Sequence, residues 1–463
     1  MKTRARIVPI LIFFLLAASL AQAAFKLPAP EKLTLKNGLV VYFLKNAEVP
    51  LISFRLNLKG AGSAQEPGEL EGIANLTADQ IMKGPAAMGA EAVSEALDFM
   101  GARIGLSASE EYAGLSVDCL AEHFPKVLDI ASACLTSPAF KDDEFEKARK
   151  IRLDGLKSIK DNPGAAVRTY FTKAYFGTHP LGHLASGSEA SLAKMTAADV
   201  RAYYQKYYGS KGAIGALVGN IEKDKALELL NAAFGGWKGA ANVPIGTMPP
   251  IPAPKGMKLI LIDKPDATQA YWVMGAPGYA LGDKLTAPAT VMNTLFGGRF
   301  TSWMSTELRI KRGLTYNTSS NFQTYRRGGL FTASSYTRNE KIGEMLEIVF
   351  DLLKKVGTEG FSAEEIESSR NYIQGQFPPT LETNASKAGT YVRLAFYNLG
   401  FDYYDKYLAA IQAVTQASAK DSAAKLIPTT DFVLVVVGKA AEIKAQLQKF
   451  GTWTEKKISD PGF

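Results

Sequence analysis

Few side chains in this sequence have the types and spacing that hydrolytic or metal chemistry requires. The chain holds three histidines. His179 and His183 have the four-residue spacing of a helical metal site, but Pro180 and Gly182 predict a turn there. His123 stands at the start of a predicted helix, where we expect it in solvent. We therefore expect no metal site at the histidines.

Arg309 and Tyr316 are the second chemical candidate. An arginine guanidinium presents a fixed fork of donors to a carbonyl or carboxylate. A preorganised donor stabilises a developing oxyanion, and loss of one such donor costs roughly 2.7–4 kcal/mol. Taken alone, the same residues could also be a salt-bridging arginine on a helix and the first residue of a strand. Their surroundings decide between the two interpretations.

Residues 60–84 surround three further positions with a frame of small and apolar residues, among them Gly72, Ile73, Ala74, Met82, Lys83 and Gly84. The segment resembles the zinc-site helix of the pitrilysin (M16) family of metallopeptidases, which includes insulinase and the mitochondrial processing peptidase. That helix carries the inverted motif H-x-x-E-H. Here its chemical positions are Asn75, Ala78 and Asp79. Zinc requires imidazole and carboxylate ligands, and the attacking water requires a Glu base. We therefore expect this chain to hold no zinc.

The segment 294–316 resembles the second conserved block of the same family, L-G-G-x-x-x-S-x-L-x-x-x-L-R-x-x-x-x-L-x-Y, with Met304 at one Leu position. Gly297-Gly298 and Gly313-Leu314 are in register with that block. The resemblance assigns Arg309 and Tyr316 to the family's Arg/Tyr pair, which faces the zinc across a clamshell. It implies that the Tyr hydroxyl steadies the oxyanion and that the Arg binds the substrate backbone or carboxylate.

The resemblance also implies a third zinc ligand, a Glu on the helix expected over about residues 141–160. Asp154 lies near that position, beside Gly155. If Asp154 faced Asp79, the two carboxylates would form a weak oxygen site that suits a hard cation better than zinc. No cofactor is therefore expected on this chain, and the resemblance places zinc in a partner subunit.

The N-terminal residues have the features of a secretory signal peptide. Lys2, Arg4 and Arg6 precede an apolar run, and residues 21–23 read Ala-Gln-Ala, a cleavage site. We expect removal of residues 1–23 and export of the mature chain, and a short signal of this kind fits a bacterial periplasm. An uncleaved anchor is the alternative, but the run is shorter than the ~20 residues that a span needs.

Charge and cysteine content restrict the function further. The formal net charge of +8 falls to +5 without the three basic residues of the signal. This mild excess is compatible with acidic peptides or anionic surfaces, and no basic stripe for nucleic acid is visible. Cys119 and Cys134 could form a disulfide in an exported protein. We favour two buried thiols that pack as small apolar groups.

The chain is predicted to be a duplication with an offset of about 220 residues. A helical apolar stripe from Phe124 to Leu135 is repeated from Ile342 to Leu353. Apolar strands at residues 213–220 and 432–439 form a second matching pair. The acidic helix starts at Phe140 and Phe361 form a third.

We expect an α+β fold of two similar halves, each a mostly antiparallel sheet with helices packed on one face. The predicted segments are the signal peptide 1–23, an N-terminal domain 24–238, a Pro-rich linker 239–256 and a C-terminal domain 257–463.

Three functions are compatible with these residues. The first is a non-catalytic subunit of an exported heterodimeric zinc peptidase, which lends Arg309 and Tyr316 to a partner bearing H-x-x-E-H. The second is an inactive peptide-binding or structural subunit. The third, an active peptidase with an unusual metal site, is disfavoured by Asn75, Ala78 and Asp79.

Overall fold

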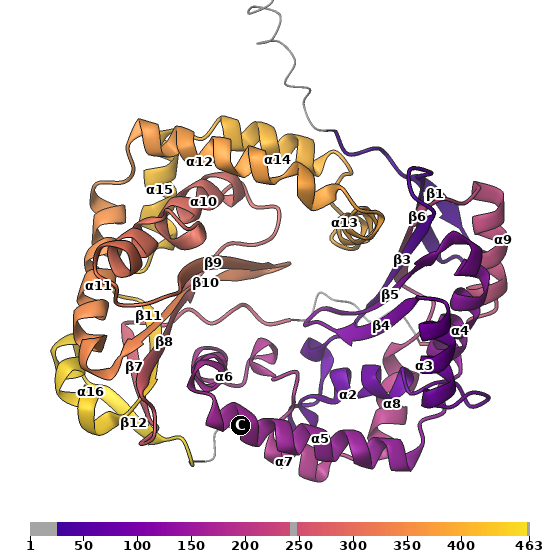
Figure 1. The fold of residues 1–463 in the computed structure, drawn as a ribbon, viewed down its shortest axis with the longest axis horizontal. Helices are drawn as coiled ribbons and strands as arrows, with labels where there is room; N and C mark the ends of the chain where they lie inside the picture. Colours follow the sequence, from indigo (N-terminus) through magenta and orange to yellow (C-terminus); the bar gives the residue numbers. More distant parts are fainter. Residues whose placement is uncertain (1–25, 241–247, 461–463) are drawn as a thin grey trace, which may run out of the picture.

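The computed structural model describes residues 26–240 and 248–460. They form two similar halves, each built on a six-stranded mixed sheet. The sheets stand on opposite sides of a ring that helices close above and below (Figure 1). The predicted α+β duplication is confirmed. The predicted signal peptide lies outside the described residues. Among the residues that are described, no helix is both long and apolar enough to cross a membrane.

The first sheet has the strand order β1-β2-β6-β3-β5-β4, and its neighbours are antiparallel except for β2 and β6. Its strands, in chain order, are β1 (Glu31–Thr34), β2 (Val40–Lys45), β3 (Leu51–Lys59), β4 (Arg103–Ala108), β5 (Tyr112–Leu120) and β6 (Ala213–Gly219).

The second sheet repeats this arrangement with the order β12-β7-β11-β8-β10-β9, and β7 is parallel to both β11 and β12. Its strands are β7 (Met257–Asp263), β8 (Gln269–Pro277), β9 (Thr318–Tyr325), β10 (Gly328–Arg338), β11 (Phe432–Gly438) and β12 (Trp453–Lys457).

Helices surround the two sheets. Those of the first half are α2 (Ile73–Ile81), α3 (Ala90–Phe99), α4 (Phe124–Thr136), α5 (Asp142–Asp161), α6 (Pro163–Phe176), α7 (Glu189–Lys194), α8 (Ala197–Tyr207) and α9 (Lys223–Phe234). Those of the second half are α10 (Thr286–Asn293), α11 (Ile342–Thr358), α12 (Ala363–Gln376), α13 (Asn384–Phe396), α14 (Tyr403–Gln412), α15 (Gln416–Leu426) and α16 (Ala440–Leu447).

The repeated stripes identified in the sequence occupy equivalent places. In α4 the apolar residues from Phe124 to Leu135 are buried in the core of the first half. In α11 the residues from Ile342 to Leu353 are buried in the core of the second half. The paired strands β6 and β11 also correspond, since each lies third in its sheet. An i, i+3, i+4, i+7 pattern buries one helix face, so equal patterns give equal packing.

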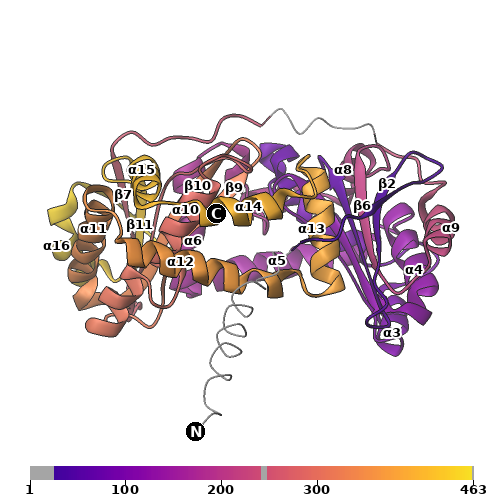
Figure 2. The same ribbon diagram turned by 90° about the horizontal axis from the view of Figure 1, so that it is seen from above.

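Each sheet also has a covered second face, and the covering helix comes from the other half. Helix α6 packs on β8 and β11 of the second sheet, where Phe171 joins a core with Val435. Helix α13 packs on β3 and β6 of the first sheet, where Tyr391 joins a core with Val218. Figure 2 shows α5 and α12 running between the halves. The sequence analysis placed helices on one face only, which describes each half's own helices but misses this exchange.

Close contacts fix the exchanged helices. At Gly275 of β8 an added Cβ would lie 2.2 Å from Cζ of Phe171, so the glycine makes room for that ring. The Tyr391 hydroxyl of α13 donates to the carbonyl oxygen of Pro28 at 2.6 Å. The Asn384 Nδ2 donates to the carbonyl oxygen of Leu51 at 3.0 Å. The two halves therefore share their cores, and neither buries both faces of its own sheet.

We predict that Phe171→Ala lowers the free energy of unfolding by about 3–5 kcal/mol, because it empties a buried aromatic site under the second sheet. Urea unfolding followed by circular dichroism measures the change. The neighbouring Thr172→Ala, at a half-buried position of α6, should cost less than about 1 kcal/mol. Equal effects of the two substitutions would show that α6 is not part of the second core.

Candidate functional site

The helix with the altered zinc-motif positions is α2, and it begins where Gly72 takes a positive φ of 91°. A side chain at Gly72 would collide with the backbone of Gly187, so glycine is required there. The Glu66 carboxylate accepts hydrogen bonds from the backbone N–H groups of Gly72 and Ala74 at 3.0 and 2.9 Å. This buried acid caps the helix start, where the helix dipole favours negative charge.

The three motif positions have different surroundings. Ala78 is fully buried, Asn75 is half-buried and Asp79 is exposed. Asp79 is ion-paired with Arg152 of α5, whose side chain is only 15% exposed. The Arg152 Nη1 also donates to the carbonyl oxygen of Ala185 at 2.8 Å. A guanidinium from the chain itself thus supplies the positive charge beside the altered motif.

Asp154, the expected counterpart of the third ligand, makes a different contact. It pairs with Lys157 at 3.3 Å, one turn along α5, and its side chain is 59% exposed. The residue of α5 that contacts Asp79 is Arg152, two positions earlier. The sequence analysis missed Arg152, and the signal available was its place about half a turn from the aligned position.

The residues of this centre do not fit zinc. An amide, a methyl group and an Asp already bound to an arginine leave no set of nitrogen and oxygen ligands. Within residues 26–240 and 248–460, no group of three His, Cys, Asp or Glu side chains could hold a metal ion. No step of a reaction can therefore be assigned to a metal on this chain.

Asn75 has a structural contact in place of a metal. Its Oδ1 accepts a hydrogen bond from the backbone N–H of Ala108, at the end of the edge strand β4, at 3.3 Å. Its Nδ2 is buried and has no hydrogen-bond partner among the described residues. The side chain lines a cavity of about 470 Å³ between the halves.

The histidines are held by local contacts. The turn predicted around Pro180 is present as a short 3₁₀ segment. His179 Nδ1 accepts from the N–H of Leu181 at 3.1 Å, while His183 Nδ1 lies 3.3 Å from a carboxylate oxygen of Glu66. The contact with Glu66 raises the pKa of His183, and burial raises the pKa of Glu66. These histidines stabilise the loops around α2.

Both cysteines are free and buried. Burial raises the pKa of the Cys119 thiol to about 12 and that of the Cys134 thiol to about 11. Neither forms the reactive thiolate at neutral pH. Of the two alternatives considered for these cysteines, the buried thiols are the one present.

Arg309 and Tyr316 lie side by side on the surface of the second half. Arg309 belongs to a π-helical turn, Ser305–Lys311, and its Cζ lies 4.2 Å from the centroid of the Tyr316 ring. The exposed ring of Phe300 lies 4.8 Å from the same atom, so the guanidinium sits between two aromatic faces. Tyr316 is 73% exposed. The sequence analysis missed Phe300, although it lies within the matched block.

The residues just before Tyr316 in the sequence are held in place by hydrogen bonds and burial. The N–H of Leu314 donates to the carbonyl oxygen of Leu308 at 2.8 Å, and Leu314 is buried. The Thr315 hydroxyl donates to the carbonyl oxygen of Asn317 at 2.9 Å and accepts from Ser335 at 3.2 Å. Tyr316 therefore projects outward from an ordered turn.

The Arg309 side chain has no hydrogen bond or ion pair with any residue that the structure describes, although its backbone carbonyl accepts from the N–H of Gly313. A salt bridge at Arg309, which one of the two interpretations of the pair required, is therefore not found among the described residues. Arg309 and Tyr316 do not line the cavity that Asn75 lines. Within one chain, the pair and the altered motif belong to separate surfaces.

Comparison with known proteins agrees with this architecture. Residues 55–187 match the family model for insulinase (peptidase family M16), and residues 194–373 match the model for the peptidase M16 inactive domain. The chain belongs to the M16 peptidase family. Its altered zinc positions place it with the non-catalytic members.

Relatives described as zinc proteases and a relative described as a non-peptidase homolog are both similar over most of the chain. An uncharacterized zinc protease, YmxG, of Bacillus subtilis is 24% identical over 77% of this chain and 86% of its own length. The non-peptidase homolog YmxG of Helicobacter pylori is 22% identical over 87% and 93%. A crystal structure of a peptidase M16 inactive domain from Pseudomonas fluorescens superposes with a TM-score of 0.81 at 26% identity, covering 89% of this chain and 98% of that one.

We predict that Asn75→His, Ala78→Glu and Asp79→His together fail to create a stoichiometric zinc site. These changes restore the motif's residue types but leave the Arg152 guanidinium against them, and a cation opposes metal binding. Adding Arg152→Glu exchanges that charge for a carboxylate and should give about one equivalent of zinc by metal analysis.

The matched control for this experiment is Arg149→Glu in the triple variant. Arg149 lies on the same helix but pairs with Glu146, so its charge reversal should not create zinc binding. Tight zinc in the triple variant with Arg152 in place would contradict the prediction.

We predict that stability decreases as pH rises above about 6.5, in part through His183. Its pKa is raised in the folded state by Glu66. The stabilisation is therefore complete below the unfolded pKa and is lost as pH rises through the folded pKa. Urea unfolding at several pH values should show a smaller decrease in His183→Asn than in the wild type. His123→Asn should keep the wild-type dependence, and an unchanged profile in His183→Asn would contradict the assignment.

Proposed function

We propose that this chain is the non-catalytic subunit of an exported heterodimeric M16 zinc peptidase. It contributes Arg309 and Tyr316 to the active site of a partner subunit that carries the intact H-x-x-E-H motif and the zinc. The supporting observation is the half-buried Arg309 side chain, which contacts the exposed rings of Tyr316 and Phe300 and has no ion pair among the described residues. Export to a bacterial periplasm is part of the proposal and rests on the signal peptide predicted from the sequence.

The roles of the two side chains follow from their chemistry. An exposed phenol on an ordered turn can donate its proton to an oxyanion as negative charge develops there. A guanidinium with free N–H groups can bind a peptide carbonyl or carboxylate through two parallel hydrogen bonds. Stacking on Tyr316 and Phe300 limits the rotamers of Arg309, so less entropy is lost on binding. Catalysis itself belongs to the partner.

The exposure of these residues supports a role at an interface between subunits. Phe300 is 59% exposed and Ile310 is 56% exposed, and both flank the pair. Tyr, Phe and Arg are enriched where proteins bind other proteins. A partner that covers this surface would bury the apolar area and exclude water around Arg309, which strengthens its interaction with substrate.

A second candidate is a peptide-binding subunit with no part in catalysis. It is favoured by a polar cavity of about 470 Å³ between the halves, which is lined by side chains from both. On this reading the chain binds peptide without a partner's active site. The two candidates differ in what loss of the Tyr316 hydroxyl does to cleavage.

We predict that Tyr316→Phe lowers kcat roughly 100-fold in the reconstituted pair, because one oxyanion donor is lost, while KM changes little. Arg309→Ala should raise KM as well, because it removes an anchor for substrate. Cleavage of a fluorogenic peptide by the purified pair with zinc measures both.

The matched control is Tyr372→Phe, which deletes a hydroxyl from another exposed tyrosine that contacts Arg299 instead. It should leave kcat unchanged. Full activity of both the Tyr316 and the Arg309 variants would exclude the catalytic role and leave the peptide-binding subunit as the function.

A further inference from the structure

Two cavities meet along helix α6 and form one groove between it and the second sheet. One measures about 470 Å³ and the other about 430 Å³. They share Arg168 of α6, Val273 of β8, Ser319 of β9 and Ser334 of β10. The groove exists because α6 is the exchanged helix, so its exposed side and the end of the second sheet face one space.

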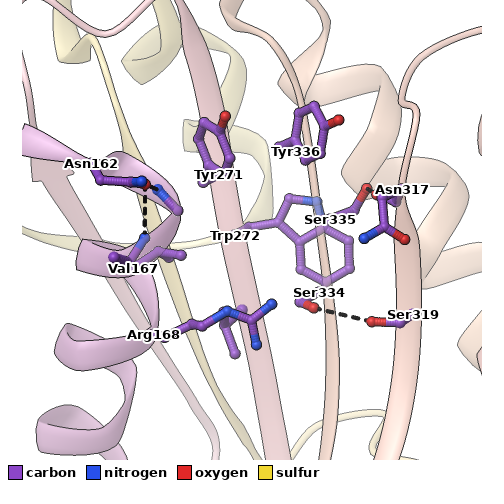
Figure 3. Close-up of a pocket in the computed structure, with 13 residues that line it drawn as sticks. Asn162, Val167, Arg168, Tyr271, Trp272, Asn317, Ser319, Ser334, Ser335 and Tyr336 are labelled. Atoms are coloured by element: carbon purple, nitrogen blue, oxygen red, sulfur yellow. Dashed lines mark hydrogen bonds between the residues drawn. The ribbon is translucent and has the colours of Figure 1, made fainter. Parts of the chain in front are cut away.

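Among the residues that the structure describes, Arg168 is the only charged side chain that lines the second cavity. It is exposed, and the described parts of the chain offer its side chain neither a hydrogen bond nor an ion pair. Figure 3 shows it extending from α6 across β8 toward Ser319 and Ser334. An arginine with five free N–H donors at the centre of a concave site can bind an anion by donating hydrogen bonds to it.

The other side chains around Arg168 are neutral donors and aromatic walls. The hydroxyls of Ser319 and Ser334 lie 3.5 Å apart, close enough to bind one ligand together. Tyr271 and Tyr336 stack at 5.0 Å with an interplanar angle of 20° and close one end of the cavity. None of the described residues that line this cavity is acidic, so no carboxylate of theirs competes with a ligand carboxylate there.

One end of the groove is lined by a residue that neighbours Tyr316 in the sequence. Asn317 lines the second cavity and follows Tyr316 directly in the chain. At the far end of the groove, the first cavity reaches Asn75 of α2. A ligand lying along the groove would thus run from Asn317 toward the altered motif, a path that suits an extended chain.

We propose that this groove binds an extended peptide and that Arg168 is the subsite for a carboxylate of that peptide. Ser319 and Ser334 complete the subsite as hydroxyl donors. The inference rests on the proposed function only in taking the ligand to be a peptide. It adds a preference for acidic sequences, which belongs to this chain without its partner.

The carboxylate could come from an Asp or Glu side chain or from the peptide's C-terminus, and three probe peptides distinguish them. The first is acetylated and amidated with one central Glu, the second carries Gln in its place, and the third carries Gln with a free C-terminal carboxylate. Binding of each fluorescently labelled peptide to the purified full chain is measured by anisotropy at low and at physiological salt. We expect the Glu peptide or the free-acid peptide to bind about tenfold more tightly than the neutral one.

Arg168→Gln tests the assignment directly. It should remove the preference and leave affinity for the neutral peptide within about twofold, because only the charged contact is lost. Arg149→Gln is the matched control, since it removes the same charge from the neighbouring helix α5. Ser334→Ala should weaken the preferred peptide about threefold, as expected for one neutral donor. Thermal unfolding of each variant verifies that the fold is retained.

The possible outcomes are distinct. A charge preference that survives Arg168→Gln, or that Arg149→Gln removes equally, overturns the subsite. Failure of all three peptides to bind overturns the groove. Tyr316→Phe should not alter binding to the isolated chain, so loss of cleavage in the reconstituted pair with intact acidic-peptide binding separates the catalytic proposal from this one.

Discussion

The structure depends on one constraint: each sheet buries both faces, and the helix that covers the second face comes from the other half. Helix α6 leaves the first half to cover β8 and β11, while α13 leaves the second half to cover β3 and β6. The two helices place cores such as that of Phe171 and Val435 across the boundary between halves. Separating the halves would expose the covered faces of both sheets at once. Each Å² of apolar surface exposed in this way would cost about 25 cal/mol.

The exchange also creates the functional surfaces. Since α6 packs on the second sheet by one side, its other side, with Arg168, faces a polar groove shared with β9 and β10. The preceding helix α5 runs past α2 and brings Arg152 to Asp79. One chain path thus determines both the groove and the charge pair at the altered motif. The Arg309–Tyr316 surface is independent of it, since it is built within the second half from a π-helical turn and the start of β9.

Charge compensation explains why the altered motif is stable without a metal. Without an opposite charge nearby, the Asp79 carboxylate on α2 would be unfavourable beside α5. Arg152 of α5 supplies that positive charge and also donates a hydrogen bond to the carbonyl oxygen of Ala185. Asn75 is used to bind the end of β4, and Ala78 fills the core. Asn75 and Ala78 are thus part of the packing, while Asp79 is held near the surface by Arg152. Arg168 and Arg309, whose side chains have no ion pair among the described residues, lie on the surfaces proposed to bind a peptide and a partner.

The sequence by itself determined the family and the duplication, because periodic burial and short motifs are local properties of the chain, and the role of Arg309 and Tyr316 stays a prediction. It could also have indicated the covered second faces, since the uninterrupted apolar strands β6 and β11 are typical of sheets buried on both sides. Only the tertiary structure decided which helix covers each of these faces, because the apolar face of an amphipathic helix does not specify the sheet on which it packs. For the same reason the sequence aligned Asp154 with the third ligand, whereas packing of α5 on α2 brought Arg152 to Asp79. Contacts between residues far apart in sequence depend on how the elements dock, and docking is set by the whole core.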